Sequence, residues 1–174
     1  MTSIKRVEAS AATQAATGIT HYVFDAPSGW KAFGPNDAEI LTQVASKEER
    51  GKSVLRVDTH GKRVEITYSI EGDNNSVVID AVVNGTPSKV AFSKDGGLIG
   101  EGFSKTVDPA INEMFRLIGS DLMALRDAPS RDVTSRRVES PYCEGLSVAI
   151  EAARSAHEWF AEMVLSTRWV WDCL

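Results

Sequence analysis

Apolar and polar side chains alternate through residues 53–93, and this is the strongest structural pattern in the chain. Within residues 63–70 the even positions are Val, Ile, Tyr and Ile, whereas the odd positions are Arg, Glu, Thr and Ser. Because successive side chains of a strand point to opposite faces, this pattern predicts a strand with one buried face. Similar alternation at residues 55–58, 77–83 and 89–93 predicts three further strands.

Short segments rich in Gly, Asn and Asp separate these strands. They are His60-Gly61, residues 73–75 and Asn84-Gly85. These residue types tolerate the positive φ angles that tight hairpin turns require. The sequence therefore predicts an antiparallel meander of four strands with one buried face.

The chain before the meander predicts two short strands and a helix. Aromatic residues place strands at residues 22–24 and 30–33. The spacing then predicts a helix over residues 37–49, with Asn36 as its cap and Glu39 in a capping-box position. Its apolar face would hold Ile40, Leu41 and Val44.

The chain after the meander has helical periodicity. Asp108-Pro109 predicts the start of a helix, because Asp is a favourable N-cap and Pro is tolerated in the first turn. A polar linker is expected at residues 127–142, followed by a helix over residues 144–166. The tail at residues 168–174 alternates, which predicts an added edge strand or an aromatic plug. The first helix would bury Ile111, Phe115, Ile118, Leu122 and Leu125.

These elements predict an α+β fold. We expect a curved antiparallel sheet of about six strands, one crossing helix and two longer C-terminal helices. Residues 1–18 would be a flexible N-terminal lead, residues 19–104 the sheet domain, and residues 105–174 a helical part. The helical part would pack on the sheet, or its helices would pair between two copies in a homo-oligomer.

Composition and charge narrow the functional classes. The chain has 174 residues and a net charge of -5. Residues 106–174 carry seven Arg or Lys against eleven Asp or Glu, which argues against nucleic-acid binding. No apolar run approaches the roughly 18 residues of a membrane span, and residues 1–18 lack the apolar core of a secretory signal. We therefore expect a cytoplasmic protein that binds no membrane.

The sequence contains few candidates for catalysis. It has no familiar catalytic, metal-binding or phosphate-binding motif, so we expect no catalytic residues, metal or cofactor. Cys143 and Cys173 fit free thiols in a reducing compartment, and a disulfide is the alternative. His157 falls on the apolar stripe of the last helix, where a hydrogen-bonded core histidine is the more ordinary role. An enzyme that pairs a cysteine with His157 is therefore the third functional hypothesis.

Residues 22–70 resemble a WWE domain. The resemblance rests on Tyr22-Val23-Phe24, on Gly29-Trp30-Lys31-Ala32-Phe33, on the expected helix with Leu41, on Ser53-Val54-Leu55 and on the strand through Tyr68. Trp30-x-x-Phe33 stands where the family has W-x-x-Y, whereas Thr42 stands where it has a glutamate. The resemblance implies a non-enzymatic pocket for ADP-ribose units or a protein-interaction module.

A nucleotide pocket would lie on the concave face of the curved sheet. We expect Phe24, Trp30 and Tyr68 to line it, with Lys31 or Arg63 meeting a phosphate at the rim. The alternative for Trp30 is that it only fills the core.

The first functional hypothesis is thus a binding module for a nucleotide-type molecule or a protein. The alternative is a small acidic protein, of the immunity-protein or secretion-chaperone type, that covers a basic partner.

Overall fold

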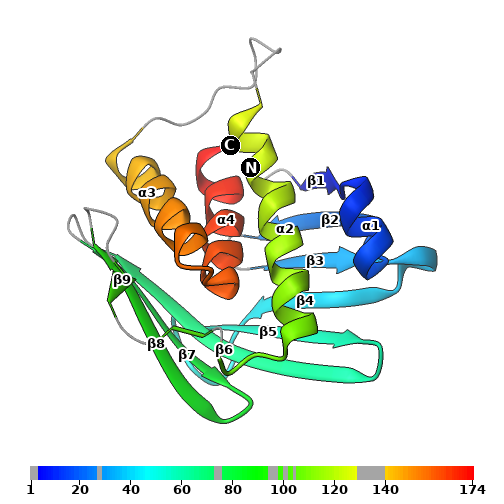
Figure 1. Ribbon diagram of the computed structural model, residues 1–174, viewed down its shortest axis with the longest axis horizontal. Coiled ribbons are helices and arrows are strands. Elements are labelled where there is room, and N and C mark those ends of the chain that lie inside the picture. Colours follow the sequence, from blue (N-terminus) through cyan, green and yellow to red (C-terminus); the bar gives the residue numbers. More distant parts are fainter. Residues whose placement is uncertain are drawn as a thin grey trace.

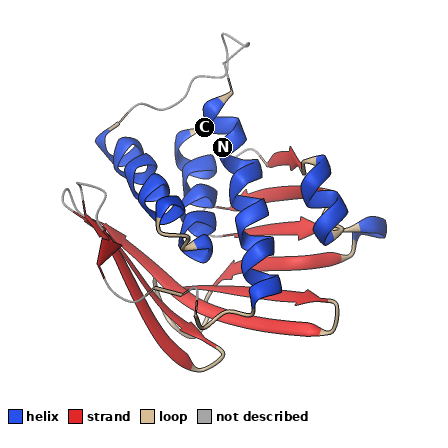
Figure 2. Ribbon diagram, in the orientation of Figure 1, coloured by secondary structure: helices blue, strands red, loops and turns tan. Residues whose placement is uncertain are grey.

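One antiparallel sheet, whose strands are ordered as they occur in the chain, organises the structure (Figure 1). The computed structural model describes residues 4–26, 29–72, 76–93, 98–99, 102–103, 105–128 and 140–174. The helices in these ranges lie on one side of the sheet, which bends around them (Figure 2). The predicted α+β class is confirmed, and within the described ranges the sheet has nine strands rather than about six.

The elements of the described residues have the following bounds. The strands are β1 Lys5–Glu8, β2 His21–Ala26, β3 Gly29–Phe33, β4 Glu39–Ala45, β5 Ser53–Thr59, β6 Lys62–Gly72, β7 Ser76–Val83, β8 Thr86–Ser93 and β9 Leu98–Ile99. The helices are α1 Ala11–Thr17, the 3-10 turn η1 Pro35–Asp37, α2 Pro109–Asp127, α3 Pro141–Ser155 and α4 Trp159–Cys173.

The meander predicted from the alternating pattern is present as β5 to β8. Its two described turns contain His60-Gly61 and Asn84-Gly85, and all four residues have positive φ angles. These angles explain why the turns use glycine and asparagine. The third expected turn, at residues 73–75, lies outside the described residues.

The helix predicted over residues 37–49 is wrong, because β4 occupies most of this range. In β4, Leu41 and Gln43 face the core while Ile40 and Val44 are more exposed. The alternation was hidden because one core-facing position carries a polar side chain. Gln43 is stable there because the Trp30 side chain donates a hydrogen bond to it.

The last predicted helix is divided into α3 and α4. The helix starting at Pro109 is confirmed as α2, with the Asp108 side chain as its cap. The predicted single helix over residues 144–166 instead breaks at His157, which has a φ of 57°. His157 is exposed rather than buried in the core, and its ring stacks on Trp159. The expected linker at residues 127–142 falls largely on residues 129–139, which are outside the described residues.

The C-terminal tail is helical, so the predicted edge strand is wrong. Residues 168–173 form the last turns of α4, and Trp169 is buried. The side chains of Cys143 and Cys173 form a disulfide that links the first turn of α3 to the end of α4. This contradicts the prediction of free thiols and confirms its alternative.

The N-terminal segment contributes to the sheet and the core. The lead expected at residues 1–18 contains β1, which pairs with β2, and α1, which Ser10 caps. The Ser10 backbone N–H also donates to Asp121 of α2. Within the described ranges, no helix is both long enough and apolar enough to cross a lipid bilayer.

Candidate functional site

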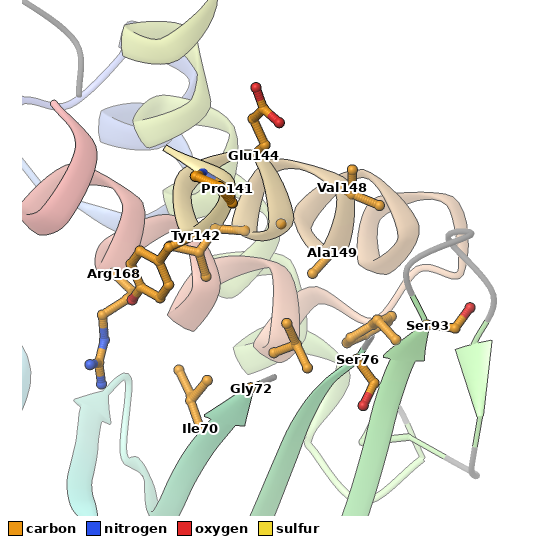
Figure 3. Close-up of a pocket in the computed structure, with 14 residues that line it drawn as sticks. Ile70, Gly72, Ser76, Ser93, Pro141, Tyr142, Glu144, Val148, Ala149 and Arg168 are labelled. Carbon is orange, nitrogen blue, oxygen red and sulfur yellow. The ribbon is translucent and has the colours of Figure 1, made fainter. Parts of the chain in front are cut away.

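A cleft opens between α3 and the ends of β6, β7 and β8 (Figure 3). Its volume is about 880 Å³, which is within the usual range for small-molecule sites. The lining is mainly apolar, with a few polar groups from the strand ends and from α4. The apolar side chains include those of Ile70, Val77, Phe92, Leu146, Val148 and Ala149.

The floor of the cleft continues the apolar face of the sheet. Val77 pairs directly with Phe92 across β7 and β8, and Ile70 lies on the neighbouring strand β6. These residues extend the stripes that form the core elsewhere in the sheet. At this end of the strands the stripe is covered less closely, because α3 leaves an open space above it.

The roof of the cleft comes from α3. Tyr142 and Val148 are 51% and 41% exposed, which places them among the exposed large apolar side chains. Between them, a Cβ atom added at Gly145 would have no neighbouring atom within 4 Å. The roof therefore offers apolar surface to the cleft and leaves unfilled space beside Gly145.

The Tyr142 side chain is held in place from α4. Its hydroxyl donates a hydrogen bond of 2.7 Å to Asp172 Oδ2. Burial, and then the hydrogen bond to Asp172, raise the pKa of Tyr142 to about 12. The hydroxyl is therefore protonated at neutral pH, as its hydrogen bond to Asp172 requires.

Arg168 supplies the positive charge of the cleft. It extends from α4 beside Tyr142 and is half-buried (Figure 3). Among the described residues it forms no ion pair with a carboxylate. Burial raises the pKa of Tyr68, and the positive charge of Arg168 opposes this increase.

The three aromatic residues predicted to line a nucleotide pocket are brought together, but inside the core. Phe24, Trp30 and Tyr68 are each at most 2% exposed. The Phe24 and Trp30 rings stack with centroids 5.7 Å apart. The Trp30 indole and the Tyr68 hydroxyl both donate to Gln43 Oε1. A ligand could reach these rings only by displacing core side chains.

The two predicted phosphate contacts lie on the opposite face of the sheet. Lys31 follows the buried Trp30 and therefore points away from the core, where it pairs with Glu39 at 2.8 Å. Arg63 precedes the buried Val64 and pairs with Asp58 at 3.2 Å. The structure therefore does not bring Lys31 and Arg63 together with Phe24, Trp30 and Tyr68.

Two buried glutamates of the helical layer have structural roles. Glu158 accepts a hydrogen bond from the Phe103 backbone N–H at 2.7 Å. A Cβ atom at Gly102 would overlap the Glu158 carboxyl group, so this contact requires glycine. Glu162 is 1% exposed and accepts from Arg154 at 3.0 Å. These contacts join α4 to the connecting chain and to α3.

The described residues offer little for the enzyme hypothesis. Cys143 and Cys173 are joined, so neither provides a thiolate in this state. His157 is exposed at the break between α3 and α4. The described part of the chain also contains no group of three His, Cys, Asp or Glu side chains placed to hold a metal ion.

The residues of the cleft were not identified as a site from sequence. Ile70, Val77 and Phe92 were recognised only as members of an apolar face. The available signal was an apolar stripe that reaches the last residues of β6 and β8 and the first residues of β7. Arg168 gives a second signal, as the one cation of a tail, residues 168–174, that is aromatic and apolar apart from Asp172.

The geometry of the cleft is the basis for a functional proposal, because comparisons with known proteins found no match. No protein-family model, curated protein or solved structure matches this chain.

Proposed function

We propose that this protein is a non-enzymatic binding protein and that its site is the cleft between α3 and the ends of β6 to β8. The observation that carries this proposal is an open cavity of about 880 Å³ between two secondary-structure layers. Its apolar lining includes the exposed side chains of Tyr142 and Val148. Exposed apolar surface of this kind, next to a concave space, is typical of ligand sites.

The proposal keeps the class predicted from sequence but moves the site. ADP-ribose binding at Trp30, and the resemblance to a WWE domain over residues 22–70, stay predictions. The burial of Trp30 supports the alternative that it fills the core. Residues 39–45, where the resemblance implies a helix, form β4. A protein partner and pairing of two copies through the C-terminal helices also stay predictions.

Gly145 allows a direct test of the cleft. We expect Gly145→Leu to fill the open space without a clash, because a Cβ atom there has no close neighbour. Leucine should also favour the helix relative to glycine. The matched control is Gly145→Ala, which gives a similar gain in helix propensity but adds little volume.

The readout is the saturable fluorescence increase of Nile red, an uncharged apolar dye. We expect the unmodified protein and Gly145→Ala to bind the dye, and Gly145→Leu to lose this binding while its melting temperature is maintained. Equal binding by Gly145→Leu would reject the cleft as the site. A melting temperature that ADP-ribose raises equally in all three proteins would instead favour the nucleotide prediction.

A cytoplasmic location remains part of the proposal, but it now requires a direct test. The expectation came from the absence of a long apolar run and of a signal-like core, and free thiols would have agreed with it, whereas Cys143 and Cys173 are joined in the structure. Disulfides persist mainly in oxidising compartments. Rapid alkylation of thiols in intact cells, followed by mass spectrometry, would distinguish a reducing compartment from an oxidising one. Cysteines found as thiols would support a reducing compartment, and a pair found in the disulfide form would reject it.

A further inference from the structure

The cleft has a polar end and an apolar end. In Figure 3, Arg168 lies at one end of the lining, whereas Val148 and Ser93 lie at the other. The intervening surface is formed largely by apolar side chains of the sheet and of α3. A ligand that fits this surface must therefore be apolar along most of its length, because unpaired polar groups would be costly there.

Arg168 is the cation at the polar end, and two carboxylates lie near the cleft. Glu144 also borders the cleft, but its carboxylate points away from the cleft (Figure 3). Asp172, one helical turn after Arg168, accepts the hydrogen bond of Tyr142. Arg168 therefore presents a guanidinium to the cleft without an ion-pair partner among the described residues.

The position of Arg168 favours a ligand with an anionic group that pairs with the guanidinium. A guanidinium forms paired hydrogen bonds with a carboxylate, and such charged hydrogen bonds are stronger in a partly buried setting than in water. The Tyr142 hydroxyl lies beside Arg168 and adds a polar group at the same end.

We propose that the cleft binds a linear amphiphile, a monomeric long-chain carboxylate whose anionic end pairs with Arg168. The hydrocarbon chain lies along α3, over Ile70, Val77 and Phe92. This inference rests on the proposed function, since it specifies the chemical class of the ligand for the same cleft.

Dodecanoate and dodecanol provide matched probes, because they share one chain and differ in the charge of the end group. Their affinities are measured by displacement of Nile red. We expect the unmodified protein to bind dodecanoate roughly tenfold or more tightly than dodecanol, from one charged interaction. We expect Arg168→Met to lose this preference and to bind dodecanoate and dodecanol with similar affinities.

Arg63→Met is the control, because Arg63 is exposed on the opposite face of the sheet and pairs with Asp58. It should keep the full preference for dodecanoate. Equal affinities in the unmodified protein would overturn the inference, even if Arg168→Met failed to fold. In that case both ligands would still bind, and the proposed function would survive. Failure of both ligands to bind would reject the proposed function itself.

A final comparison distinguishes a free carboxylate from a lipid surface. We expect no co-sedimentation of the protein with vesicles of phosphatidylcholine and phosphatidylserine. Co-sedimentation that Arg168→Met abolishes would overturn the assignment to a monomeric ligand and would favour an anionic lipid headgroup.

Discussion

Tyr22 and Asp121 form a buried hydrogen bond across 99 positions of the chain. The Tyr22 hydroxyl on β2 donates to Asp121 Oδ2 on α2 over 2.6 Å. Both residues are buried, and the same carboxylate oxygen accepts the Ser10 backbone N–H at 3.2 Å. Burial, and then the bond to Asp121, raise the pKa of Tyr22. This contact therefore joins the N-terminal strands to the helical layer.

Tyr22→Phe should remove this bond without changing the shape of the core. We expect a loss of about 1.5–3 kcal/mol in the free energy of unfolding, because the acceptor is a buried carboxylate. Urea melts followed by circular dichroism provide the measurement. Tyr142→Phe is the control, since its hydroxyl also donates to a carboxylate but the residue is 51% exposed. A loss for Tyr22→Phe no larger than that of the control would contradict the role of the contact.

Phe115→Ala should test the packing of α2. Phe115 is fully buried and lies against Phe160 of α4, with ring centroids 5.7 Å apart. We expect a loss of about 3–5 kcal/mol in the free energy of unfolding, from lost burial and the remaining cavity. Val44→Ala, at a position 49% exposed, should change stability by less than about 0.5 kcal/mol. Similar urea midpoints for the two variants would mean that α2 is loosely packed.

The sequence predicts the fold best where each pattern has one structural solution. The meander was clear because Val64, Ile66 and Tyr68 alternate with polar residues and the turns carry glycine. The pattern failed at β4, where the polar Gln43 occupies a core position and leaves the helical spacing of Ile40, Leu41 and Val44 more apparent. Trp30 and Tyr68, from other strands, both donate to Gln43 and make it suitable for the core.

The candidate site is less predictable, because it depends on how elements far apart in sequence are placed. A tryptophan such as Trp30 suits either a core or a pocket, and only the residues that pack around it show which of the two it lines. The cleft requires α3 to stand away from the ends of β6 to β8, and no local pattern encodes that separation. The break at His157, which turns the chain from α3 into α4, likewise occurs beside a contact between distant residues, because Glu158 accepts a hydrogen bond from the Phe103 backbone N–H.

Glu162 should make stability depend on pH in an unusual direction. Burial is the main cause that raises its pKa, and the hydrogen bond from Arg154 only partly opposes this. At pH values above 4.5, the ordinary pKa of a glutamate, the folded state therefore binds more protons than the unfolded state. The stabilising contribution of the protonated group is therefore present below pH 4.5 and is lost as pH rises through the folded pKa.

Glu162→Gln should remove this contribution, because glutamine remains uncharged. We expect the variant to be more stable than the unmodified protein at neutral pH, with the difference disappearing toward pH 4.5 and below. Glu113→Gln should instead lower stability at neutral pH, because the hydrogen bond from Arg116 lowers the pKa of Glu113. Thermal melts from acidic to neutral pH measure both effects. A Glu162→Gln variant that is less stable at neutral pH would show that the pair with Arg154 outweighs burial.

The disulfide should be a major source of stability for the C-terminal helices. Cys143 and Cys173 are buried and separated by 30 positions, so the bond restricts a long loop in the unfolded chain. We expect the double variant Cys143→Ala/Cys173→Ala to lose about 2–4 kcal/mol in the free energy of unfolding. Guanidinium melts with and without reductant provide the measurement. Reductant should lower the midpoint of the unmodified protein toward that of the double variant and leave the variant unchanged.

Because the bond holds the first turn of α3 beside α4, the same reduction should weaken Nile red binding. A midpoint insensitive to reductant, in protein whose two thiols react with an alkylating agent before unfolding, would show that the cysteines are free.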